Sequence, residues 1–126
     1  MAKSILPAVS PAETEVLRIV WETRQATVQD VCDKLASRRK RKVAYATVQT
    51  LLRRLEKKGY LKHRARGKAH LFHAAVRRED VIRRTVGDFL DRLFGGDAVP
   101  LVQYLAEHGQ IDADDIDNLK QLIKEK

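Results

Sequence analysis

The sequence contains little cysteine and no long apolar run. Cys32 is the single cysteine among 126 residues, so no disulfide can form within the chain, and its place on an apolar helical stripe predicts a buried thiol. No run of about 18 apolar residues occurs, which excludes an ordinary transmembrane helix, and the start of the chain lacks the apolar segment of a signal peptide. We therefore expect a cytoplasmic protein that makes no membrane contact.

The sequence also lacks the residue clusters that enzymes and metal sites use. No Cys, Asp or Glu stands at a metal-ligand spacing from the histidines, and His70 and His73 would face opposite sides of a strand. There is no glycine-rich phosphate loop and no nucleophile elbow. We therefore predict no catalytic residues, no metal site and no cofactor, and catalysis is the weakest of the functional hypotheses.

Positive charge is abundant, but it is concentrated in the front of the chain. The formal net charge is +8, and residues 1–73 hold 17 Lys and Arg against 6 Asp and Glu, whereas residues 74–126 hold 8 against 11. This asymmetry favours a polyanion-binding module followed by a different interaction surface. A membrane-surface protein is the alternative, but the basic residues do not gather on one amphipathic helix with Trp and Phe opposite.

Residues 44–59 combine an apolar helical stripe with a polar face that suits a DNA groove. The apolar positions, which recur at i, i+3, i+4 and i+7 and are predicted to face a core, are Val48, Leu51, Leu52 and Leu55. The other side carries hydroxyl, carboxamide and guanidinium groups, which hydrogen-bond base edges and phosphates. Gly59 is suited to close the helix. The pattern predicts a recognition helix, and an ordinary amphipathic helix with a solvated face is the alternative.

Two shorter helices are predicted before this stretch. The first begins at Pro11, is capped by Ser10 and runs to about Thr23, with Trp21 expected in the core. The second begins after Thr27, which repeats the cap signature, and its apolar stripe is formed by Val28, Val31, Cys32 and Leu35.

A basic run and a basic hairpin flank the predicted recognition helix. The run from Arg38 to Lys42 is either a solvated loop or a phosphate-contacting segment, and we favour the second. Residues 60–65 and 69–73 predict two strands joined by a tight turn at residues 66–68. Three helices followed by such a hairpin form a winged helix-turn-helix. The cations expected on phosphate here are Arg38, Arg39, Lys40, Arg41, Lys42, Arg64, Arg66 and Lys68.

The back half of the chain predicts three amphipathic helices. The first spans residues 77–93, the second follows Gly95-Gly96 with Asp97 as its cap, and the third is capped by Asp112. These helices are too small to bury their apolar stripes alone, so a partner is implied, and a second copy of the chain is the simplest one. The residues expected in this dimer interface are Ile82, Val86, Phe89, Leu90, Leu93, Leu101, Val102, Leu105, Ile116, Leu119 and Ile123.

The predicted fold is mainly α with a small β-hairpin. Residues 1–76 form a winged-helix DNA-binding domain, and residues 77–126 form a helical dimerisation domain. A winged helix that binds proteins instead of DNA is the second functional hypothesis. Such a module should expose apolar side chains on its third helix or hairpin tip, where this chain offers Thr, Gln and Arg, with Arg66 and Lys68 beyond.

Three segments resemble the BlaI/MecI-type penicillinase repressors over nearly the whole chain. They are Pro11-Ala12-Glu13 with Val16 and Trp21, the stretch Thr47–Leu55, and Phe89–Asp97. The resemblance implies a dimer that binds a short dyad operator in double-stranded DNA and represses β-lactamase or related resistance and stress genes. It also implies base contacts by Thr47, Gln49 and Thr50, and phosphate contacts by Arg53 or Arg54.

Three departures from the family pattern bear on regulation. Many members are inactivated by a sensor protease at an Asn-Phe bond, but Tyr104-Leu105 stands at that position, so the induction route stays open. The Cys-x-Cys motifs of copper-responsive relatives are absent, and Ala46 replaces a frequent lysine, so the operator sequence is not inherited. Nothing in the sequence argues for a small-molecule pocket between the two domains.

Overall fold

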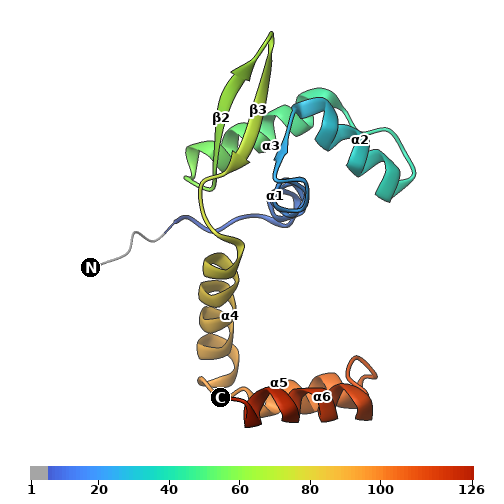
Figure 1. Cartoon of the computed structure of the whole chain (residues 1–126), viewed down its shortest axis with the longest axis vertical. Coiled ribbons are helices and arrows are strands. Elements are labelled where there is room, and N and C mark those ends of the chain that lie inside the picture. Colours follow the sequence, from blue (N-terminus) through green and yellow to red (C-terminus); the bar gives the residue numbers. More distant parts are fainter. Residues whose placement is uncertain (1–5) are drawn as a thin grey trace. The chain divides into compact units, whose positions relative to one another are not determined.

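The computed structural model describes residues 6–126, so the predicted lack of a signal segment falls partly outside the described residues. The chain divides into two compact units, Met1–Asp80 and Val81–Lys126. In order along the chain, the elements are α1 (Pro11–Thr23), β1 (Gln25–Ala26), α2 (Val28–Arg39), α3 (Tyr45–Lys57), β2 (Leu61–Arg66), β3 (Ala69–Ala74), α4 (Arg78–Phe94), α5 (Val99–Glu107) and α6 (Ala113–Lys124) (Figure 1). The predicted fold class, mainly α with a small β-hairpin, is confirmed.

Capping boxes begin both α1 and α2, as the sequence predicts. At α1, the backbone N–H of Glu13 donates to Ser10 Oγ at 3.1 Å, and the Glu13 carboxylate accepts from the Ser10 N–H at 2.8 Å. Thr27 and Asp30 make the same reciprocal pair at α2. Each box satisfies two backbone N–H groups that a helix start otherwise leaves unpaired.

Helix α3 packs its apolar stripe against α1 and α2. Val48, Leu52 and Leu55 are fully buried as predicted, whereas Leu51 is only half-buried. The helix ends before Gly59, whose φ of 95° lies in the left-handed region. This backbone conformation favours glycine, and a Cβ atom there would also lie 3.0 Å from Leu6 Cδ2, so the Leu6 side chain would have to shift slightly.

A three-stranded antiparallel sheet completes the first unit, with the strand order β1-β3-β2. Strands β2 and β3 pair from Leu61↔Ala74 to Arg66↔Ala69, which leaves a two-residue turn at Gly67-Lys68, with Gly67 at φ 60°. The inward side chains of Leu61 and Phe72 are buried, whereas Trp21, predicted as a core anchor, is only half-buried. The hairpin projects beyond the helices as a wing (Figure 1).

The second unit consists of α4, α5 and α6. The α4–α5 connection contains Gly95-Gly96. Asp97, the predicted cap of α5, lies one residue before the actual N-cap, and its Oδ1 accepts a hydrogen bond from the Val99 N–H at 3.0 Å. Asp112 and Asp115 form a capping box at α6. None of the three helices contains a buried residue. Within residues 6–126, no helix has the length and apolarity needed to cross a membrane.

Candidate nucleic-acid interface

The polar face of α3 is accessible and carries no internal partners. Thr47 and Thr50 are exposed, and Gln49 is half-buried between them. Arg53 and Arg54 extend the same face toward the end of the helix, and both are exposed. Within residues 6–126, no hydrogen bond or ion pair holds any of these five side chains. Their donors and acceptors are therefore free to bind an external polar surface.

Tyr45 is a residue of this face that sequence reasoning missed. It occupies the first position of α3, and 52% of its surface is exposed, so among residues 6–80 it is the one large hydrophobic residue that is exposed. Tyr45 precedes Val48 by three residues and so continues the spacing of the apolar stripe, but it lies in the first turn of α3, where its ring is exposed. An exposed aromatic ring beside unpaired hydroxyl groups can contact a thymine methyl group or donate its hydroxyl to a phosphate.

The basic run divides into two parts with different partners. Arg38 and Arg39 belong to the last turn of α2, where Arg38 pairs with Glu22 and Arg39 with Glu15 at 2.5 Å, both acids being on α1. The hydrogen bond from Arg38 holds the pKa of the Glu22 carboxyl below its ordinary value.

The second part of the run faces solvent. Lys40 takes a left-handed conformation at φ 56°, which turns the chain out of the helix. Lys40, Arg41 and Lys42 are exposed and have no ion pair in the described part of the chain. The structure therefore separates two arginines that tie α2 to α1 from three cations that are available to an anion.

The wing carries further free cations at its tip. Arg66 and Lys68 flank the turn and are exposed, and neither has a partner within residues 6–126. Arg64, lower on β2, instead donates to Gln25 Oε1 on β1 at 2.8 Å. This contact ties the wing to the two-residue strand β1, which has no sequence pattern of its own.

A cluster on the inner side of the hairpin joins the wing to α3. His63 Nδ1 lies 2.7 Å from Glu56 Oε2, and the His63 ring stacks on His70 with the two centroids 4.2 Å apart. The His63 ring also meets Phe72 with the centroids 5.5 Å apart. The two histidines are thus engaged in side-chain packing, and the described residues form no group of metal ligands.

The end of α3 is anchored by a buried ion pair. Lys58 Nζ donates to Glu13 Oε1 at 2.6 Å and to the Ala8 carbonyl at 2.9 Å. Burial raises the pKa of Glu13, but the hydrogen bond from Lys58, the N–H of Ser10 and the charge of Lys58 together hold that pKa below its ordinary value. Lys58 therefore stabilises the first unit and is not one of the unpaired cations available to an anion.

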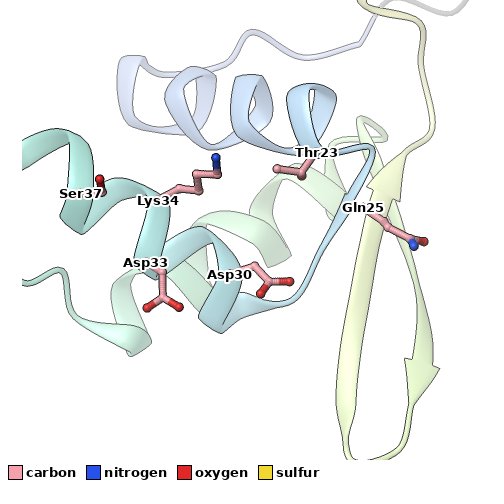
Figure 2. A pocket seen from close by; sticks show the side chains of 6 residues that line it. All are labelled: Thr23, Gln25, Asp30, Asp33, Lys34 and Ser37. Atoms are coloured by element: carbon pink, nitrogen blue, oxygen red, sulfur yellow. The ribbon is translucent and has the colours of Figure 1, made fainter.

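A shallow depression of about 370 Å³ lies beside β1 and α2. Figure 2 shows Thr23 and Lys34 pointing toward one another, whereas Asp30, Asp33 and Gln25 point in other directions. Their polar atoms are also engaged elsewhere, since Asp30 caps α2, Asp33 accepts from Gln29, and Gln25 accepts from Arg64. The depression therefore lacks the converging groups that a reaction needs.

Comparison with known proteins places this geometry in a family. The family model described as "Penicillinase repressor" matches residues 9–125. The penicillinase repressor of Bacillus licheniformis is 28% identical over 120 residues, which cover 95% of this chain and 92% of that protein. Such coverage includes both units, so the similarity is not confined to the winged helix.

Solved structures of related proteins resemble the first unit. The DNA-binding domain of the repressor BlaI matches with a TM-score of 0.53 and 28% identity, covering 62% of this chain and 93% of that one. The monomeric form of Bacillus licheniformis BlaI, solved in complex with the blaP half-operator, matches with a TM-score of 0.50 and 29% identity, covering 60% and 90%. On the match across residues 9–125, the chain belongs to the penicillinase repressor family of DNA-binding transcriptional repressors.

Proposed function

We propose that this protein is a sequence-specific transcriptional repressor that binds a dyad operator as a homodimer and acts in the cytoplasm. The observation that carries the proposal is the α3 face, whose Thr47, Gln49 and Thr50 side chains lack internal partners. Exposed cations flank it on both sides, in the Lys40–Lys42 segment and at the wing tip. DNA-binding proteins use this arrangement, in which unpaired hydrogen-bonding groups contact base edges and the surrounding cations contact phosphates.

In this proposal α3 enters the major groove, and the cations around it bind the backbone. Thr47, Gln49 and Thr50 contact base edges. The phosphate contacts come from Lys40, Arg41, Lys42, Arg53, Arg54, Arg66 and Lys68, with Arg64 near the edge of the footprint. Arg38 and Arg39 belong to this set only if they leave Glu22 and Glu15, with which they pair in the structure.

The homodimer part of the proposal rests on the apolar surface of the second unit. The large hydrophobic side chains exposed there include Ile82, Val86, Phe89, Leu93, Val102, Leu119 and Ile123. Leu90, Leu101, Leu105 and Ile116 are half-buried, and no residue of the three helices is buried. A second copy would cover these side chains, and a two-fold dimer would present two α3 helices to two half-sites.

The relatives support a proposal for the class of regulated genes. A penicillinase repressor of similar length and a BlaI structure bound to the blaP half-operator support β-lactamase or other antibiotic-resistance genes, or cell-envelope stress genes, as targets. Repression then follows if the bound dimer excludes RNA polymerase from the promoter.

The test is recovery of sheared genomic DNA by the purified protein at two salt concentrations. Phosphate contacts alone weaken steeply with salt, whereas base contacts preserve a preference among sequences. We expect short dyad sites that survive at the higher salt and lie upstream of resistance or envelope genes. Uniform recovery that disappears at the higher salt would overturn the proposal and favour a winged helix that binds another protein.

A further inference from the structure

A groove of about 760 Å³ lies within the first unit, away from the α3 face. Its walls come from the end of α1, the end of β3 and the segment that leads into α4. Trp21 and Val76, which are both half-buried, supply the accessible apolar surface, whereas Val20 is fully buried, and Arg24, His73 and Arg78 supply polar groups. Small-molecule sites likewise combine apolar walls with a few polar groups.

The groove has an excess of positive charge. Three arginines line it, Arg24, Arg77 and Arg78, against one acid, Glu79. Glu79 already pairs with Arg77 at 3.3 Å. Arg24 and Arg78 make no hydrogen bond or ion pair within residues 6–126. The two guanidinium groups are thus available to an anion.

The backbone at Arg24 is held in an unusual conformation. Arg24 ends α1 with φ 70° and ψ −38°, a region that a residue with a side chain rarely adopts. Backbone strain of this kind is concentrated at binding and switch sites. Here it occurs at a residue whose cationic side chain lines the groove.

The groove is also separate from the expected DNA contacts. His73 and Ala74 are at the base of β3, and Ala74 is five residues from the wing end of the strand at Ala69. At a rise of about 3.3 Å per residue, this places the groove about 16 Å along the strand from the wing tip.

We propose that this groove binds a small amphipathic anion, an aromatic or branched apolar body that carries a carboxylate. The apolar body packs on Trp21 and Val76, and the carboxylate accepts hydrogen bonds from Arg24 and Arg78. The groove includes Ala75–Glu79, the segment through which the DNA-binding unit continues into α4. An occupied groove restricts the conformations of that segment. The inference goes beyond the proposed repressor function and does not depend on the operator.

Trp21 provides a direct readout because it is the only tryptophan in the chain. Its Nε1 atom is buried and has no hydrogen-bond partner among the described residues. A ¹⁵N-labelled full-length protein therefore gives a single indole N–H signal that responds to changes at the groove wall. We would titrate it with 2-naphthoate and, in parallel, with the uncharged 2-naphthamide.

We expect saturable movement of the indole signal with 2-naphthoate and at least about tenfold weaker binding of the amide, since the amide lacks the charge that the two arginines bind. The double variant Arg24→Gln/Arg78→Gln should weaken 2-naphthoate binding by about tenfold or more. Arg18→Gln, on the exposed side of α1 and outside the groove, is the matched control and should bind normally.

Two results would overturn the inference. Equal affinity for naphthoate and naphthamide, or an unmoved indole signal, would show that the groove does not select an anion. A double variant that binds naphthoate normally but loses DNA affinity would assign Arg24 and Arg78 to the phosphate backbone.

Discussion

Lys58 at the end of α3 and Glu13 in the first turn of α1 form an ion pair, with Nζ and Oε1 separated by 2.6 Å. Glu13 is 2% exposed, so the carboxylate is almost completely withdrawn from water. Lys58 also binds the Ala8 carbonyl, and the Tyr60 hydroxyl donates to the Pro7 carbonyl at 2.5 Å. Lys58 and Tyr60 therefore connect the end of α3 to α1 and to the segment that precedes α1.

Replacing Lys58 should destabilise the first unit strongly. Lys58→Met leaves the Glu13 carboxylate buried without its counter-charge, and the loss of one partner of such a pair costs about 3 kcal/mol. Lys57→Met is the matched control because Lys57 is exposed and makes no ion pair within residues 6–126. Urea unfolding followed by Trp21 fluorescence measures the difference, and equal midpoints for the two variants would contradict the assignment.

The same pair should make stability depend on pH in the acid range. Because the pKa of Glu13 in the folded chain lies below its ordinary value of 4.5, the folded state binds fewer protons than the unfolded state there. The ionised carboxylate thus stabilises the fold above pH 4.5, and this contribution is lost as the pH falls through the lowered pKa.

Glu13→Gln tests this dependence. The gap in unfolding free energy between the original chain and Glu13→Gln should be full at pH 7 and shrink below about pH 4. Asp33→Asn, which removes an exposed carboxylate that makes no ion pair within residues 6–126, controls for the loss of one negative charge from the first unit. A gap that stays constant from pH 7 to pH 3 would mean that Glu13 contributes no charge-dependent stability.

The wing and α3 should have separable effects on DNA binding. Arg66→Ala with Lys68→Ala should weaken binding to all sequences about equally and reduce the salt slope by about 0.9 per lost phosphate contact. Gln49→Ala or Thr50→Ala should instead reduce discrimination between operator and random DNA by about 1 to 3 kcal/mol per contact. Fluorescence anisotropy at several salt concentrations separates the two effects, and identical behaviour of both sets would contradict the division.

The two parts of the basic run should also differ. Lys40→Ala with Arg41→Ala removes exposed, unpaired cations and should lower the salt slope of operator binding by about 2. Arg38→Ala with Arg39→Ala removes the same charge, but these side chains pair with Glu22 and Glu15, so the salt slope should change little. If both pairs flatten the salt dependence equally, the two arginines leave α1 when DNA binds.

An acidic residue in the apolar surface of the second unit should dissociate the dimer. Leu93 is 68% exposed in the single chain, and Leu93→Glu would place a charge in the proposed interface at a desolvation cost of several kcal/mol. Arg84→Glu, nearly half a helical turn from Leu93 around α4, is the matched control. Sedimentation equilibrium should show a monomer for the first variant only, and an unchanged dimer would move the interface elsewhere.

Local patterns predicted most of the elements because their signals lie within a few residues. The Ser10 and Thr27 caps set the starts of α1 and α2, and the spacing of Val48, Leu52 and Leu55 predicted the buried side of α3. Strand β2 begins and ends one residue later than predicted, whereas β3 begins at the predicted residue and ends one residue later. These features depend on backbone capping and helical or strand period, which the sequence displays directly.

Features that depend on distant residues could not be predicted in this way. Strand β1 exists because Gln25 pairs with His73, and two residues carry no periodicity. The sequence predicts only that Lys58 is a favourable charge at the end of a helix. Its partner Glu13 is 45 residues away, so the ion pair gives no local pattern. Arg38 and Arg39 read as part of a uniform basic run, and only their packing against α1 distinguishes them from Lys40 and Arg41.

None of α4, α5 and α6 contains a buried residue in the single chain, so the proposed dimer would link the turnover of these helices to the concentration of the protein. Helices that are covered only by a partner chain gain that protection by mass action, so their opening free energy rises with the concentration of the protein. Proteases cleave in proportion to the open population when reclosing is fast. A dilute repressor would therefore be degraded faster per molecule than an abundant one, which sharpens the switch between a silent and an active promoter.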